Sequence, residues 1–308
     1  MREILKILLY FAAVVVIAAI FSPPLYWLGE AVAARFHLAF LDVDFHAYFD
    51  RAILIAAIAL LYPLAKALRI ESRASLGLHP NPFWKRDLIV GLGLACGSAI
   101  ALTGCAWYLQ AWRVRHWEQL SQVLIALQAA AVVPLIEEPL FRGVLQGAVQ
   151  RTASRRTAFV FVAVLFAIVH FLTKPQHPIP PESIGWFSGF QIIPLMFWKF
   201  TTPQTLLGSF TTLLLVSLIL GYARVATASL WMPIGLHAGW ILGQKLGKIG
   251  WRDLDKRPAS SALWFGDTVL DGLCPVLILL LTSVLVFWIL RGRQRATPAI
   301  PGPSRKAE

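Results

Sequence analysis

Two adjacent glutamates and an arginine lie inside a long apolar stretch of this chain. They are Glu137, Glu138 and Arg142, in the segment Val133–Gly143 (VPLIEEPLFRG), which follows an alanine- and leucine-rich run that begins at Leu120. If this segment is a membrane helix, each charge at hydrocarbon depth costs about 2.5–3.5 kcal/mol on insertion scales. Three such charges within six residues indicate a function in the membrane or a compensating partner.

The composition of the chain is that of a membrane protein. Of its 308 residues, 57% are hydrophobic and only 14% are charged, whereas soluble domains contain about 25% charged residues. The mean hydropathy is +0.66. The three cysteines lack a CxxC spacing, so neither a disulfide framework nor a thiolate metal site is indicated. We therefore predict an all-α, polytopic integral membrane protein.

Eight apolar segments are long enough to cross a membrane, given about 20 residues per crossing. They are residues 4–21, 48–68, 88–109, 119–138, 157–173, 205–222, 229–246 and 269–290. We expect about eight transmembrane helices, the first of which is retained because no small-residue cleavage site follows it. The glycines at 91, 93, 97 and 104 suit close helix packing. The proline-rich, aromatic stretch 174–204 is interpreted as an interfacial or re-entrant segment.

The basic residues indicate membrane topology and not a nucleic-acid partner. The formal net charge is +12, but Lys and Arg are spread over short loops and the C-terminal tail, without the clustered face that nucleic-acid binding needs. Alternate connections carry most of them, and the positive-inside rule places these connections in the cytoplasm. We expect both termini inside, in a bacterial inner (cell) membrane whose lipid bilayer surrounds the chain. The basic loop 247–268 does not fit this pattern.

Helical geometry separates the roles of the two glutamates. Residues i and i+4 share one face of a helix, so Glu138 and Arg142 are predicted to form an ion pair, with the glutamate at the favourable N-terminal position. Glu137 points elsewhere and has no partner within the segment. A lone carboxylate in an apolar setting suits a general base that works near neutral pH.

Two prolines flank the glutamates and free backbone carbonyls. Pro139 removes the hydrogen-bond donor to the carbonyl of Leu135, and Pro134 does the same to Ala130. Freed carbonyls at membrane depth need another partner, which water in a cavity could provide. The pattern predicts that Glu137 lines a hydrated pocket.

Two of the seven histidines fall in predicted membrane segments. His170 lies near the end of the fifth segment and His237 lies inside the seventh. A carboxylate and two imidazoles could hold a zinc ion with an open position. Equally, the carboxylate could activate a water directly, while the histidines orient it and stabilise an oxyanion. Both arrangements would hydrolyse an amide.

These residues carry a resemblance to a known family. The motif Glu-Glu-x-x-x-Arg (Glu137, Glu138, Arg142), then Phe-x-x-x-His at 166–170, then a later His237 in a proline-containing helix, resembles the CPBP family. This family groups type II CAAX prenyl endopeptidases with bacterial Abi and bacteriocin-processing relatives. The resemblance covers about residues 120–245.

The resemblance implies an all-helical intramembrane peptidase with a site open towards the cytoplasm. It implies that Glu137 is the base that activates water, assisted by His170, that Glu138 and Arg142 support the site, and that His237 helps to form the oxyanion site. The substrate would be a membrane-associated protein or peptide, prenylated or not. We divide the chain into N-terminal helices (1–118), a CPBP-like catalytic core (119–246), and a loop, last helix and basic tail (247–308).

One position departs from the family pattern. The family often has Asn or Asp four residues after the last histidine, whereas this chain has Ile241. The aliphatic side chain offers neither an oxyanion donor nor a metal ligand, which places prenyl-protein processing in more doubt than peptidase activity. Because an HExxH motif is also missing, we favour a mechanism without a cofactor. The alternative is zinc on Glu137, His170 and His237.

Two other functions are open. Intramembrane Glu, Arg and His side chains also form proton relays in transporters, although no internal repeat is visible. A non-catalytic immunity or scaffold protein of the same fold is the other alternative, since Ile241 leaves it open. A single membrane histidine, or a pair such as Glu138 and Arg142, can also serve only helix packing.

Overall fold

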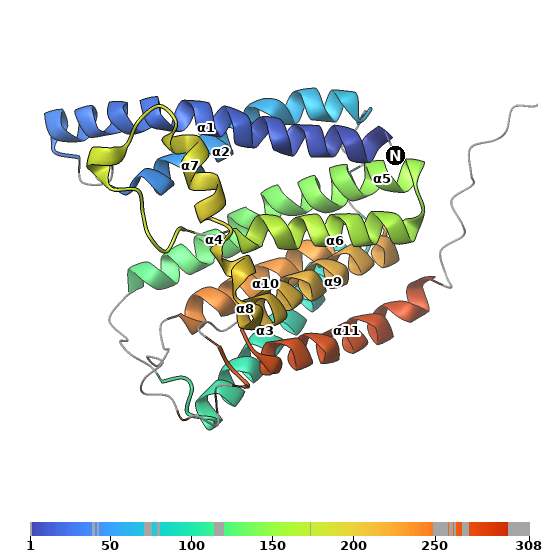
Figure 1. Cartoon of the computed structure of the whole chain (residues 1–308). Coiled ribbons are helices and arrows are strands. Elements are labelled where there is room, and N and C mark those ends of the chain that lie inside the picture. The colour runs from blue at the N-terminus through green and yellow to red at the C-terminus, as the bar shows by residue number, and fades with distance from the viewer. Residues whose placement is uncertain are drawn as a thin grey trace, which may run out of the picture.

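The fold is a bundle of helices (Figure 1). The computed structural model describes residues 2–38, 41, 43–70, 76–78, 81–113, 120–172, 174–248, 258, 261, 263–266 and 271–294. Within these ranges the α-helices are α1 (Arg2–Phe36), α2 (Phe45–Ala67), α3 (Trp84–Tyr108), α4 (Leu120–Glu138), α5 (Gln146–Thr152), α6 (Arg155–Phe171), α7 (Ser188–Leu195), α8 (Pro203–Thr205), α9 (Thr211–Thr227), α10 (Trp231–Gly247) and α11 (Leu273–Gln294). Two π-helices, η1 (Pro139–Leu145) and η4 (Leu206–Phe210), and two 3-10 helices, η2 (Pro181–Ser183) and η3 (Trp198–Thr201), complete them. No strand occurs among the described residues, so the predicted all-α class is confirmed.

Six helical segments within the described ranges are long and apolar enough to cross a membrane. They are Arg2–Phe36, Phe45–Ala67, Trp84–Tyr108, Leu120–Thr152, Leu206–Thr227 and Leu273–Arg291. The expected count of eight is therefore not confirmed. The fifth and seventh expected segments do form helices, α6 and α10, but each has only 17 residues. At about 1.5 Å per residue, each is about 25 Å long, against about 30 Å of bilayer hydrocarbon.

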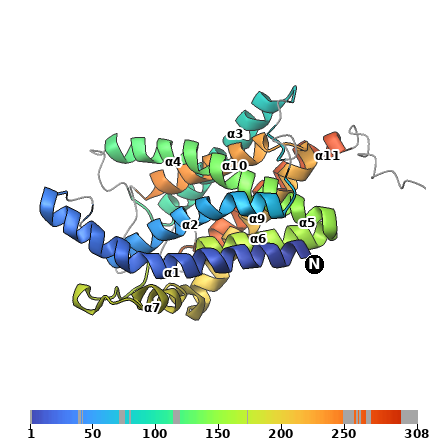
Figure 2. The same ribbon diagram turned by 90° about the horizontal axis from the view of Figure 1, so that it is seen from above.

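The first helix is longer than the sequence suggested. It continues past the predicted end at residue 21, through Pro23 and Pro24, to Phe36. α1 and α2 lie side by side (Figures 1 and 2), and α11 lies along the opposite edge of the bundle in Figure 1. A hydrogen bond from the Tyr10 hydroxyl to the carbonyl oxygen of Ala57 (2.9 Å) joins α1 to α2.

α3 and α10 pack with their backbones in close contact. A Cβ atom added to Gly91 would lie 2.6 Å from the carbonyl oxygen of Met232, and one added to Gly235 would collide with the carbonyl oxygen of Leu88. The predicted packing role is thus confirmed for Gly91. It is not confirmed for the glycines at 93, 97 and 104, where an added Cβ would meet no atom of the described residues within 4 Å. At Gly91 and Gly235 the backbones of α3 and α10 can come close together because no side chain separates the two helices.

The buried apolar side chains of the described residues form four clusters, and two of them contain sequence neighbours of the predicted site residues. One cluster is built by α1, α2, η1, α5 and α6 and includes Phe141 and Phe166. The other is built by α3, α9, α10 and α11 and includes Met232 and Leu236. Of the helices that carry predicted site residues, α6 belongs to the first cluster and α10 to the second.

The proline-rich stretch packs on the first helix. Within it, α7 lies against α1 (Figure 2), and Gly189 approaches the carbonyl oxygen of Ala19 so closely that no Cβ would fit. Two neighbouring aromatic side chains, Trp186 and Phe187, are 68% and 75% exposed. Exposed aromatic rings suit a membrane interface. The interfacial location of this segment stays a prediction.

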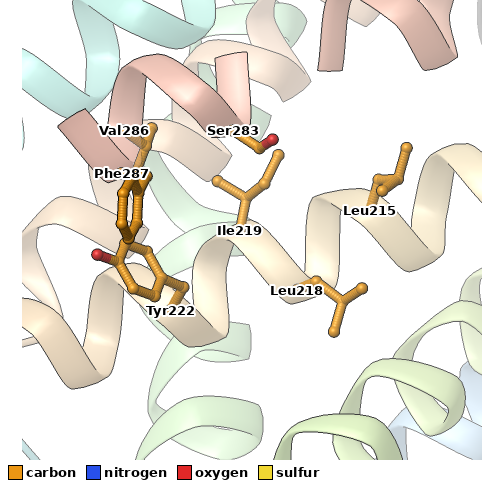
Figure 3. A pocket seen from close by; sticks show the side chains of 7 residues that line it. All are labelled: Leu215, Leu218, Ile219, Tyr222, Ser283, Val286 and Phe287. Carbon is orange, nitrogen blue, oxygen red and sulfur yellow. The ribbon is translucent and has the colours of Figure 1, made fainter. Parts of the chain in front are cut away.

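A shallow apolar groove lies between α9 and α11 (Figure 3). It has a volume of about 300 Å³ and is lined by Leu215, Leu218, Ile219, Tyr222, Ser283, Val286 and Phe287. None of the ionisable residues that the sequence singles out borders it. The groove therefore belongs to the surface of the bundle and not to the candidate site.

Candidate active site

A π-helix follows directly after the two glutamates. Pro139 opens η1, and the N–H of Gln146 donates to the carbonyl of Phe141, five residues back. Pro139 cannot donate to the carbonyl of Leu135, so the α-helical hydrogen-bond pattern is broken at this point in any case. π-helical turns are rare and often occur at functional sites. The wide turn places Arg142 one turn beyond Glu138.

The predicted ion pair between Glu138 and Arg142 is confirmed. Arg142 Nε lies 3.5 Å from Glu138 Oε2, and both side chains are fully buried. Neither of these two atoms has a hydrogen-bond partner among the described residues, so the contact is a charge pair and not a close hydrogen bond. The guanidinium also lies over the rings of Phe166 (4.8 Å) and Phe141 (5.7 Å). Both charges are thus held inside the protein.

Glu138 has a second partner that the sequence did not predict. His237 Nδ1 donates a hydrogen bond to Glu138 Oε1 at 2.7 Å, and the histidine side chain is only 7% exposed. A charge-assisted bond of this length is among the stronger hydrogen bonds in proteins. Glu138 therefore connects Arg142 on η1 with His237 on α10. Helical spacing within one segment could not reveal this contact, because the two residues are 99 positions apart.

Glu137 faces a different histidine and is more accessible than its neighbour. Glu137 Oε2 lies 3.0 Å from His170 Nε2, and the two side chains are 25% and 26% exposed. The other ring nitrogen, His170 Nδ1, donates to the carbonyl oxygen of Phe166 at 2.9 Å. Because Nδ1 carries a proton, the contact between Nε2 and the carboxylate needs one more proton between them, on either partner. Glu137 and His170 therefore form a proton-sharing pair.

The carboxylate of Glu137 also lies near the second imidazole. Its Oε2 atom is 3.9 Å from His237 Nε2, while the Nδ1 of His237 is fixed by Glu138. Both imidazoles therefore present Nε2 to Glu137 and use Nδ1 for a structural hydrogen bond. The structure thus brings together all five residues that the sequence singled out, although their chemical roles stay predictions.

A zinc site on Glu137, His170 and His237 is the alternative arrangement. Among the described residues, no group of three or more His, Cys, Asp and Glu side chains has a geometry that could hold a metal ion. His170 Nε2 lies at hydrogen-bond distance from Glu137, so these two donors are engaged with each other. The mechanism without a cofactor stays a prediction, and we derive no step through a metal.

The position that departs from the family pattern contributes no polar group. Ile241 is half-buried on α10, one turn beyond His237. The neighbouring indole is also engaged elsewhere, since Trp240 Nε1 donates to the Ser98 hydroxyl at 2.9 Å. The turn of α10 after His237 therefore offers no additional donor to the site from these two residues.

Fold and site together define a helical membrane protein with a buried carboxylate–histidine network and one accessible carboxylate. Comparison with known families agrees with this class. Residues 119–242 match the model of the family described as type II CAAX prenyl endopeptidase Rce1-like. The match supports membership of the CPBP family for this region of the chain. At family level the match supports a CAAX-type intramembrane protease, and the apolar helices together with this family indicate an integral membrane protein.

Two further comparisons gave no relative. No curated protein and no solved structure matches the chain. The matched region contains both glutamates, Arg142 and both histidines, whereas the first three helices lie outside it.

Proposed function

We propose that the chain hydrolyses a peptide bond of a membrane-associated protein or peptide with a water molecule activated by Glu137. The observation that carries this proposal is the contrast between the two glutamates. Glu138 is fully buried and paired, whereas Glu137 is a quarter exposed and lies beside two imidazoles. A general base must lie within hydrogen-bond reach of the proton that it abstracts, and of the two glutamates only Glu137 is accessible enough for a water molecule to reach it.

The proposed reaction begins when Glu137 accepts a proton from the water. The resulting hydroxide attacks the carbonyl carbon of the scissile bond, which forms a tetrahedral oxyanion. The C–N bond then breaks, and Glu137 returns the proton to the leaving amine. His170 holds the carboxylate in place through its Nε2 contact. General base catalysis of this kind contributes about 10²- to 10⁴-fold to the rate.

His237 is the proposed oxyanion donor. Its Nδ1 is fixed on the carboxylate of Glu138 at 2.7 Å, which stabilises a positive imidazolium whose Nε2–H can donate to the oxyanion. Ile241 supplies no donor, so we assign this role to His237. Glu138 and Arg142 act through His237 and hold it in position. This arrangement needs no metal and no other cofactor.

The family match and the apolar helices support a proposal for the substrate class. We propose a membrane-associated protein or peptide that is cut near its C-terminus or leader. Proteins of the CAAX prenyl endopeptidase type suggest a prenylated C-terminal peptide as the first substrate to test. The missing donor at Ile241 makes an unprenylated peptide the necessary second substrate.

The test is cleavage of a panel of prenylated peptides, unprenylated peptides and membrane proteins by the purified chain in lipid nanodiscs. Wild type is compared with Glu137→Gln, and Glu182→Gln, an exposed carboxylate on η2, serves as the matched control. Each protein is assayed with and without a chelator. We expect cleavage by the wild type and by the control, with or without chelator, and loss in Glu137→Gln.

Other outcomes would assign a different function. Loss of wild-type activity with chelator, restored by zinc, would replace the direct mechanism with a metal on Glu137, His170 and His237. Full activity of Glu137→Gln would contradict the assigned base. If the wild type cleaves nothing in the panel, ion flux that depends on Glu137 would indicate a transporter, and its absence would favour the scaffold alternative.

A further inference from the structure

The ring of Phe166 touches several members of the site. It stacks on the imidazole of His170, with ring centroids 3.9 Å apart and an angle of 23° between the planes. The guanidinium of Arg142 lies over the same ring at 4.8 Å, and His237 meets it edge-on at 6.0 Å. Phe166 itself is only 1% exposed. The sequence marked this residue as part of a motif but gave it no role.

Phe166 holds His170 at two points. Its backbone carbonyl accepts the hydrogen bond from His170 Nδ1 at 2.9 Å, and its ring stacks on the imidazole face. The hydrogen bond fixes one atom of the imidazole but leaves the ring plane free to tilt about that atom. The stacking contact fixes the plane. Together they aim Nε2 at Glu137, 3.0 Å away.

We propose that Phe166 is a positioning residue that sets the ring plane of His170 and thereby the contact with Glu137. This inference rests on the proposed function only for its kinetic consequence. Phe166 makes no proposed contact with the substrate. Its effect is transmitted through His170.

The charges around the ring argue that the aromatic face itself matters. An aromatic face attracts cations through its quadrupole. The buried guanidinium of Arg142 lies over the face of the Phe166 ring. His170 becomes a second cation whenever it holds the shared proton of the pair with Glu137. A leucine would fill much of the space but offers no aromatic face. Phe166→Leu should therefore disturb the core packing less than it disturbs the position of His170.

The experiment compares Phe166→Leu with Phe161→Leu. The control removes the same kind of ring from the same helix, five residues before Phe166, where Phe161 is partly buried against the core cluster. Both variants are first shown to fold to the same extent as the wild type. The first readout is the set of imidazole resonances of His170 in histidine-labelled protein, assigned by comparison with His170→Gln. The second readout is the separation of kcat from KM.

We expect one narrow set of His170 ring signals in the wild type and in Phe161→Leu. In Phe166→Leu the signals should broaden or split, because the ring plane is no longer fixed. We expect kcat to fall by about 10- to 100-fold in Phe166→Leu, the size of effect that misplacing a reacting group by about 1 Å produces. KM should change by less than about twofold, because a residue that does not touch the substrate leaves its binding unchanged.

Unchanged His170 signals in Phe166→Leu would overturn the proposal, whatever the activity. So would a fall in kcat no larger than that in Phe161→Leu. The spectroscopic readout does not need a substrate, so it decides the proposal even if the wild type cleaves nothing. Cleavage that depends on Glu137, together with unchanged His170 signals, would refute the role of Phe166 and leave the proposed function standing.

Discussion

The same substitution, Glu to Gln, should affect different properties of the protein at the two adjacent glutamates. Glu138→Gln removes the charge from a carboxylate that is fully buried between Arg142 (3.5 Å) and His237 (2.7 Å). Glu137→Gln changes a carboxylate that is 25% exposed and has His170 as its close partner. The first change should mainly reduce stability and the second should mainly reduce activity.

The magnitudes follow from burial. Removing one partner of a buried ion pair leaves an uncompensated charge and costs about 3–5 kcal/mol. In Glu138→Gln the stranded charge is the guanidinium of Arg142, whose side chain is fully buried. A glutamine at position 137 keeps a hydrogen-bonding group near His170, so its cost in stability should be about 1 kcal/mol or less. Its activity should fall by about 10²- to 10⁴-fold through loss of the base.

The assay is reversible unfolding in mixed micelles at increasing SDS content, with wild type and both variants measured in parallel, followed by peptide cleavage. Similar unfolding free energies for Glu138→Gln and Glu137→Gln would refute the reasoning, because the argument depends on the difference in burial. A stable, fully active Glu138→Gln would also remove the proposed support of His237.

Two smaller effects can be measured by the same unfolding assay. Gly235→Ala should cost about 1–3 kcal/mol because its Cβ would collide with the carbonyl of Leu88, whereas Gly93→Ala, in open space, should not destabilise; equal effects would contradict the close packing. The Lys174 ammonium, which donates a hydrogen bond to Asp44, lowers the pKa of that carboxyl. The stability from this exposed pair is therefore present above the usual aspartate range and lost as pH falls through the lowered pKa. Asp44→Asn should cost less than about 1 kcal/mol at pH 7, with no difference from wild type at strongly acidic pH, and a larger or pH-independent cost would argue against this linkage.

The fold class could be predicted from the sequence because long hydrophobic runs are typical of helices buried in lipid. The residues at which the helices end could not be predicted in this way. The apolar run of α1 ends near residue 21, but the helix continues through Pro23 and Pro24. Composition likewise could not distinguish a full crossing from the 17-residue helices α6 and α10. The expected domain limits and the membrane orientation stay predictions, and much of the basic loop 247–268 and the tail from residue 295 lie outside the described residues.

The candidate site was predictable where spacing along one helix decides the contact. Glu138 and Arg142 are four residues apart, and helical geometry alone places them together. The bond between Glu138 and His237 depends on how α4 packs against α10, which no local pattern encodes. The role of Phe166 was hidden for a related reason, because its ring could equally have filled the core. Three-dimensional packing supplies the information that the sequence motif lacks.

The shortness of α6 has a consequence for the lipid around the site. His170 lies one residue before the end of this helix, which stops well short of the far end of α1 (Figure 1). A helix of about 25 Å in hydrocarbon of about 30 Å creates a hydrophobic mismatch, which a bilayer relieves by thinning locally. Where α6 meets the bilayer, we expect such thinning to bring headgroups and their water closer to the pair Glu137 and His170. A short helix would in this way shorten the path by which water reaches a carboxylate inside a membrane.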